Sequence, residues 1–272
     1  CSLWANTASN NTAIGYQSSL SNTSGSCNTS VGAFSLGDST TGSSNTAVGY
    51  ASSYRNTTGC QNSALGFESM YSNTTGINNV AIGYRSLRPS TTASRNVAVG
   101  YEAGRSITTG SCNTFMGECA GRETTTGATN TAFGRCALAS SQTSNDATAI
   151  GNGALRLQST GARNTAVGWS SLCATTTGGC NTSIGVNSLS SVSTGTENTA
   201  IGFQAGSWAT ATTTGSYNVF LGAYGSPANA SDNCSLVIGA SSQTIGKGSN
   251  TGYVFVGLAG NIYQGNNSSS WA

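Results

Sequence analysis

Cysteine is the residue type with the clearest chemical potential in this chain, because the sequence holds nine cysteines and no histidine. The commonest general base and metal ligand is therefore missing, and no two cysteines have the C-x-x-C spacing of a zinc site. The eight acidic residues are scattered, so no pair of carboxylates is expected to converge. We expect no enzyme activity, no metal and no cofactor. The cysteines instead indicate disulfide chemistry in an oxidising, extracellular setting.

The element that must position these cysteines is a repeat of 17 residues. A glycine recurs at this interval from Gly15 to Gly202, and further repeat glycines follow at Gly222, Gly239 and Gly257. The unit reads roughly N-T-A-V-G-Y-x-S-L-x-x-x-T-T-G-x-x, which is too short for a helix with a return path but can hold short strands joined by tight turns. We predict an all-β fold: a parallel β-solenoid (β-roll or β-helix) of about fifteen 17-residue coils. Residues 1–10 form a lead-in, residues 11–260 a single repeat domain and residues 261–272 a tail.

One apolar residue stands directly before each repeat glycine, and a small residue precedes it. We assign this apolar column as the candidate core column: Ile14, Val31, Val48, Leu65, Ile82, Val99, Ile150, Val167, Ile184 and Ile201. Adjacent strand residues face opposite sides, so the column either points outward and is buried by lateral association, or stays inside because the chain bends there. A weaker apolar column lies four residues after the glycine: Leu36, Met70, Leu87, Leu138, Leu155, Leu172 and Leu189. Thr-Thr-Gly segments such as Thr57-Thr58-Gly59 are predicted as turns in which glycine has positive φ.

The repeat restricts how the cysteines can pair. Cys119 and Cys136 are 17 residues apart, so they should lie on adjacent coils near the ~5.5 Å that a disulfide prefers between Cα atoms. Cys173 and Cys180 flank one turn and are a second candidate pair. The remaining cysteines have no evident partner and are candidates for disulfides to neighbouring subunits: Cys1, Cys27, Cys60, Cys112 and Cys234. The alternative is that cysteines serve as small buried apolar side chains.

Charged residues, only 7% of the chain, also follow the repeat. Glu68, Arg85 and Glu102 share one column with alternating sign, which supports a parallel stack. A second column is like-charged and contains Arg88, Arg105 and Arg122. Two interpretations of this arginine column stay open. One is a solvated edge, and the other is a site for a sulfated or acidic glycan or for a carboxylate-bearing neighbour.

Glycosylation sequons occur at several asparagines. Asn22, Asn56 and Asn73 all lie seven residues after a repeat glycine, so we expect them on one exposed edge, where they would carry sugar if the source is eukaryotic. The motif asparagines Asn28 and Asn181 are expected to bond turn backbone instead.

The unit N-[TSV]-[AS]-[VIL]-G, seen at residues 45–49 and 198–202, resembles the head repeats of trimeric autotransporter adhesins (YadA-like) and related repeats of phage tail fibres. The resemblance covers nearly all of residues 10–260. It implies a β-roll, of which three copies pack around a common axis through an aliphatic column. The 17-residue period, the nine cysteines and the lack of a coiled-coil stalk differ from the usual pattern of those adhesins.

Together these features predict a structural subunit of an extracellular filament or fibre, located outside the cell or on a cell or virion surface. The repeats run almost to both ends of the sequence without a capping pattern, which favours self-assembly through the ends, the apolar side or both. The first alternative is an adhesin or tail-fibre head that binds a surface glycan or receptor, and an ice-binding solenoid is a weaker one. The net charge of +2 gives no reason to expect nucleic acid, and no apolar run is long enough to span a membrane.

Overall fold

The computed structural model describes residues 2–239, 245–255 and 261–265. Over these residues the chain is an all-β parallel β-solenoid of about 13 coils of about 17 residues, with no helix. The fold class and period predicted from the sequence are confirmed. The coil number was overestimated because the last repeat glycines were counted as full coils, whereas the final described strand, Asn261–Gly265, runs antiparallel to its neighbour.

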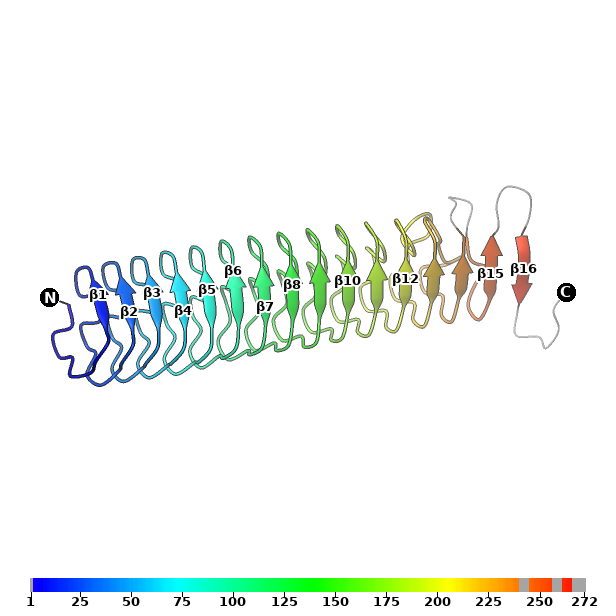
Figure 1. The fold of residues 1–272 in the computed structure, drawn as a ribbon. Coiled ribbons are helices and arrows are strands. Elements are labelled where there is room, and N and C mark those ends of the chain that lie inside the picture. The colour runs from blue at the N-terminus through cyan, green and yellow to red at the C-terminus, as the bar shows by residue number, and fades with distance from the viewer. Residues whose placement is uncertain (1, 240–244, 256–260, 266–272) are drawn as a thin grey trace. The chain divides into compact units, whose positions relative to one another are not determined.

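The chain divides into two compact units, Cys1–Cys136 with Ser140–Thr143 and Ala137–Ala139 with Ser144–Ala272. Within each unit the strands follow one another in chain order, and a loop leads from each strand to the next (Figure 1). The first unit holds β1 (Thr12–Ile14), β2 (Thr29–Val31), β3 (Thr46–Val48), β4 (Ser63–Leu65), β5 (Val80–Ile82), β6 (Val97–Val99), β7 (Thr114–Met116) and β8 (Thr131–Phe133). The second holds β9 (Thr148–Ile150), β10 (Thr165–Val167), β11 (Thr182–Ile184), β12 (Thr199–Ile201), β13 (Val219–Leu221), β14 (Leu236–Ile238), β15 (Gly252–Phe255) and β16 (Asn261–Gly265).

Strand pairing follows the 17-residue period. In the first unit Val48 pairs with Leu65 and Ile82 with Val99, so equivalent residues of successive coils lie one above the other, as predicted. The second unit keeps this register from β9 to β12. Between β12 and β13 the pairing distance becomes 20 residues, because the loop after Gly202 is three residues longer.

Strands β1 to β14 are only three residues long, because the repeat glycine ends each of them. Gly83 shows why: its φ of +125° is unfavourable for other residues, and a Cβ atom there would lie 2.4 Å from the carbonyl oxygen of Gly100 in the next coil. The position therefore requires glycine both for its backbone conformation and for the close approach of two coils.

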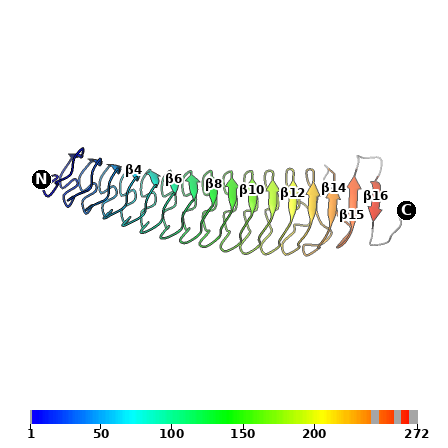
Figure 2. The ribbon, with the colours of Figure 1, turned by 60° about the horizontal axis from the view of Figure 1, so that its bottom comes forward.

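The core lies between each strand and the loop that returns behind it; Figure 2 shows the path of these strands and loops from a second direction. The middle strand residue points into this space, and Ala81 and Ala98 are completely buried. The apolar column predicted four residues after the glycine faces it, because Met70, Leu87 and the equivalent leucines of both units have no exposed surface.

Where the alanine column holds a large side chain, the leucine column beside it holds glycine. Phe115 occupies the alanine position of β7 and is fully buried. The leucine positions beside it are Gly104 and Gly121, where a Cβ atom would lie 3.1 Å and 2.5 Å from the Phe115 ring. Phe220 and Gly206 repeat this exchange in the second unit, with a separation of 3.0 Å. A large residue is thus accommodated by removing its neighbour's side chain, as close packing demands.

Each unit contains a ladder of buried asparagines that stand four residues before most of the repeat glycines; Ala147 and Ser235 take this position before Gly151 and Gly239. The Asn79 side chain donates from Nδ2 to the carbonyl oxygen of Ala93 at 2.9 Å, and its Oδ1 accepts the backbone N–H of Asn96 at 3.0 Å. Asn28 and Asn181 make the equivalent bonds to Gly42 and Gly195, which confirms the backbone role expected for them. The ladder satisfies polar groups that the narrow coil cannot expose to water.

The Thr-Thr-Gly glycines do not have the positive φ predicted for them. Gly59, for example, is not among the residues in the left-handed region. A Cβ atom at this position would instead lie 2.5 Å from the carbonyl oxygen of Gly76 and 2.3 Å from Oδ1 of Asn56. Glycine is needed here for close contact between coils. The left-handed turns are made by other residues, such as Arg85, Leu87 and Arg95.

Candidate functional site

The aliphatic column before the repeat glycine lies on the outer face of the strands and is not the core of the single chain. In the first unit Ile14, Leu65 and Ile82 expose between 38% and 60% of their surface, while Ala64 and Ala81, which precede the latter two, are buried. In the second unit Ile150, Ile184 and Ile201 are similarly exposed. The valines of the column are half-buried in both units: Val31, Val48 and Val99 in the first and Val167 in the second. Strand alternation causes this, because only every second residue can face the narrow interior. Of the two directions left open by the sequence, the side chains of this column take the outward one.

A second exposed column follows the glycine and is rich in aromatic residues. In the first unit the rings of Tyr50, Phe67, Tyr84 and Tyr101 form a continuous stack, with centroids 5.2 to 5.4 Å apart and interplanar angles of 12° or less. In the second unit the column includes the exposed side chains of Trp169, Val186 and Phe203. We call the two columns that border the repeat glycine the apolar stripe of each unit.

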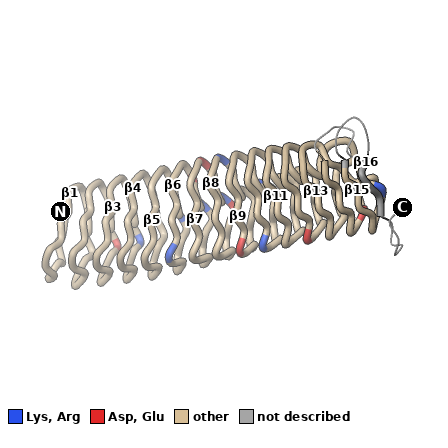
Figure 3. The backbone as a smooth tube through the Cα atoms, turned by 45° about the vertical axis from the view of Figure 1, so that its right-hand side comes forward, with Lys and Arg blue, Asp and Glu red and all other residues tan. Residues whose placement is uncertain are grey.

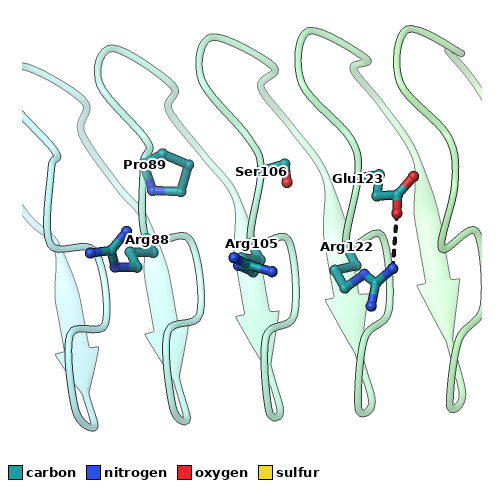
Figure 4. Close-up of a pocket in the computed structure, with 6 residues that line it drawn as sticks. All are labelled: Arg88, Pro89, Arg105, Ser106, Arg122 and Glu123. Carbon is teal, nitrogen blue, oxygen red and sulfur yellow. Dashed lines mark hydrogen bonds and ion pairs between the residues drawn. The ribbon is translucent and has the colours of Figure 1, made fainter.

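Charged residues are sparse along both units (Figure 3). Arg88, Arg105 and Arg122 lie at the same place on three successive coils (Figure 4). With Pro89, Ser106 and Glu123 they line a groove of about 370 Å³, which we call the arginine groove.

Buried carboxylates hold two of these arginines from behind. Oε2 of Glu68 accepts hydrogen bonds from Nε of Arg88 at 2.8 Å and from Nε of Arg85 at 2.9 Å, which confirms the predicted alternation of charge. Although burial opposes ionisation, the bonds from the two arginines bring the pKa of Glu68 below its ordinary value. Glu102 lies 3.5 Å from Nη1 of Arg105 in the same way. Both carboxylates are only 11% to 15% exposed, so the arginines form the surface.

The arginine column continues as tyrosines in the two preceding coils. Tyr54 and Tyr71 stack with centroids 5.4 Å apart, and the guanidinium of Arg88 lies 5.3 Å from the Tyr71 ring centre. Together with Phe34 and Tyr50 they line a hollow of about 220 Å³. The negative charge of Asp38 and partial burial raise the pKa of Tyr54, so this phenol stays protonated at neutral pH.

The three candidate glycosylation sites are buried, contrary to the exposed edge predicted for them. Asn22, Asn56 and Asn73 are at most 1% exposed, and each donates from Nδ2 to the carbonyl oxygen three residues later. A glycan cannot be attached to these nitrogens in the folded chain. The sequence contained an indication that this position is buried: in two other coils it is occupied by the apolar residues Ile107 and Val192.

All eight cysteines in the described part of the chain are free thiols, so the two predicted disulfides are not formed. Burial is the main cause of a raised pKa of the Cys119 thiol, and the nearby Cys136 thiol raises it further, so the two residues do lie close together. In an in-register stack, however, equivalent Cα–Cβ bonds run parallel, so the Cβ atoms stay near the ~4.8 Å coil spacing and not the ~3.8 Å of a disulfide.

The pair Cys173 and Cys180 differs in environment. Cys173 is half-buried and donates from Sγ to the carbonyl oxygen of Ser190 in the next coil at 3.4 Å, whereas Cys180 is exposed. Of the intermolecular candidates, Cys27, Cys112 and Cys234 are exposed, Cys60 is half-buried, and Cys1 lies outside the described residues.

We expect Cys180 to react with iodoacetamide several-fold faster than Cys173 at pH 8. Burial raises the pKa of Cys173 and reduces its reactive thiolate fraction, so its labelling rate should continue to increase toward higher pH. Peptide mapping by mass spectrometry after timed labelling measures both rates in one sample. Equal rates at pH 8 would contradict the environments described here.

Among the residues that the structure describes, no group of three or more histidine, cysteine, aspartate or glutamate side chains could hold a metal ion. The same residues include no helix with the length and apolar character needed to cross a membrane. Comparisons with protein-family models, curated proteins and solved structures give no match to the chain.

Proposed function

We propose that this chain is a structural, non-enzymatic subunit of an extracellular fibre, and that its copies associate side by side through the apolar stripe. The observation that carries the proposal is the outward aliphatic column, which recurs in nearly every coil and is bordered by exposed aromatic rings. Soluble monomers rarely expose apolar surface continuously over such a length.

The repeat spacing favours a second copy of this chain as the partner. Side chains in the stripe recur at the coil spacing of ~4.8 Å, and another ladder with the same spacing can match them along its whole length. Burying the remaining surface of each half-exposed isoleucine contributes ~1 kcal/mol. Summed over several coils and two columns, this is comparable to the ~4 to 15 kcal/mol cost of association.

Two further features support the assignment. The resemblance of the repeat to heads of trimeric autotransporter adhesins, whose copies pack through an aliphatic column, agrees with lateral association. The exposed thiols of Cys27, Cys112, Cys180 and Cys234 are available for disulfides between neighbouring copies in an oxidising extracellular medium. The alternative function, an adhesin or fibre head, is favoured by the arginine groove, which could face a receptor.

Replacing Ile82 with aspartate is expected to weaken self-association at least ~30-fold, equivalent to ~2 kcal/mol, because a buried apolar contact is exchanged for a charge without a partner. Sedimentation velocity of the full chain, over a range of concentrations, measures the change. Thr92→Asp is the matched control: it introduces the same charge at an exposed position outside the stripe.

Two results would overturn the proposal. One is a wild-type chain that remains a monomer at the highest concentration tested under oxidising conditions. The other is equal weakening by Ile82→Asp and Thr92→Asp, which would mean that association depends on net charge and not on the stripe.

A further inference from the structure

The arginine groove presents three cationic side chains at the interval of one coil. The side chains of Arg88, Arg105 and Arg122 are 39%, 46% and 40% exposed, so the three guanidinium groups are accessible together. The largely buried carboxylates of Glu68 and Glu102 restrict the movement of Arg88 and Arg105, and the exposed carboxylate of Glu123 pairs with Arg122. A row of preoriented arginines can bind anionic groups at lower entropic cost than free surface side chains.

Most of the hydrogen-bond donors in this row remain available. In the described structure Arg88 bonds Glu68 through Nε, while Arg105 and Arg122 each bond a carboxylate through one Nη atom. A guanidinium has five N–H donors, and its planar fork matches the two oxygens of a carboxylate or sulfate. Each arginine can therefore keep its internal contact and still bind an external anion.

From this arrangement we infer that the arginine groove binds a linear acidic polysaccharide that carries about one carboxylate or sulfate group per sugar. The arginines recur every ~4.8 Å, close to the advance of one sugar unit along an extended chain. The adjoining hollow, lined by Tyr54 and Tyr71, supplies phenol groups that can bond sugar hydroxyls.

The aromatic residues favour a polysaccharide over a single-stranded nucleic acid. Nucleic-acid sites use open aromatic faces on which bases stack. Here Tyr54 and Tyr71 stack on each other, and Arg88 covers the other face of Tyr71. These contacts occupy the ring of Tyr71, the aromatic residue beside Arg88, while the phenol hydroxyls and the guanidinium groups remain for a sugar chain. The inference does not depend on whether copies of the chain associate.

Calorimetric titration of the full chain with oligogalacturonate, heparin oligosaccharide and neutral dextran tests the proposal. We expect binding to at least one acidic oligomer, weakening as salt is added, and none to dextran. Preference between the first two identifies the acidic group as carboxylate or sulfate. Arg105→Gln should weaken binding about fivefold, and replacing all three arginines with glutamine should abolish it.

Two variants separate the groove from general charge effects. Arg95→Gln removes the same charge from an exposed position in another column and should leave affinity unchanged. Glu123→Gln removes an exposed carboxylate beside Arg122 and should strengthen binding about threefold, a gain that a misfolded variant cannot produce. The proposal is overturned if Arg95→Gln and Arg105→Gln lose affinity equally, if Glu123→Gln weakens binding, or if dextran or single-stranded oligothymidine binds as well as the acidic sugars.

Discussion

Replacing Gly83 with alanine is expected to lower the free energy of unfolding by ~4 kcal/mol or more. The added Cβ atom would lie 2.4 Å from the carbonyl oxygen of Gly100. The alanine would also have to adopt a backbone φ of +125°. Neither strain can relax locally, because Gly83 and Gly100 belong to coils held together by the β5–β6 pairing. Urea unfolding followed by circular dichroism measures the loss.

Gly153→Ala provides the matched control in the second unit. Gly153 also has a positive φ, of 69°, but the nearest atom to an added Cβ is Oγ of Ser170 at 3.5 Å, an ordinary contact. In Gly153→Ala only the left-handed backbone conformation is unfavourable, and it should lower the free energy of unfolding by ~1 kcal/mol. Similar losses in the two variants would contradict the close approach of coils as the main reason for the repeat glycine.

Replacing Asn79 with alanine is expected to cost ~3 to 5 kcal/mol of stability. The change leaves the carbonyl oxygen of Ala93 and the backbone N–H of Asn96 without their partners in the coil interior. Each buried polar group that loses its hydrogen bond costs ~1 to 3 kcal/mol, and the lost amide also interrupts the ladder to the next coil.

Asn78→Gly is the corresponding control. Asn78 carries the same side chain but is exposed, and glycine readily adopts its φ of 58°. A change within ~0.5 kcal/mol is expected for such a surface position. Thermal unfolding of the three proteins in parallel measures both effects, and an Asn79→Ala protein as stable as Asn78→Gly would show that the ladder is energetically unimportant.

Sequence reasoning about individual side chains was less reliable than reasoning about columns. Asn56 has a sequon, yet its amide is buried because it bonds the carbonyl of Gly59 three residues later. Cys119 and Cys136 stack as predicted, but their parallel Cα–Cβ bonds keep the thiols apart. In both cases residue position was correct and side-chain direction decided the chemistry.

The sequence by itself determined the fold class, the 17-residue register and the stacking of equivalent residues such as Ile82 and Val99. These follow from periodicity, because a chain that repeats at a fixed interval satisfies its backbone by pairing each unit with the next. It also identified two apolar columns, without deciding which of the possible faces each would occupy.

Only the tertiary structure decided which residues face inward. The coil is narrow, so Ala81 and Leu87 fill it and Ile82 must point outward. The same confinement buries the asparagine ladder, and the loop geometry brings Arg88, Arg105 and Arg122 to one groove beside Tyr71. A one-residue difference in strand position reverses the face of every side chain, and the interior volume that selects between the two faces exists only once the coil has closed.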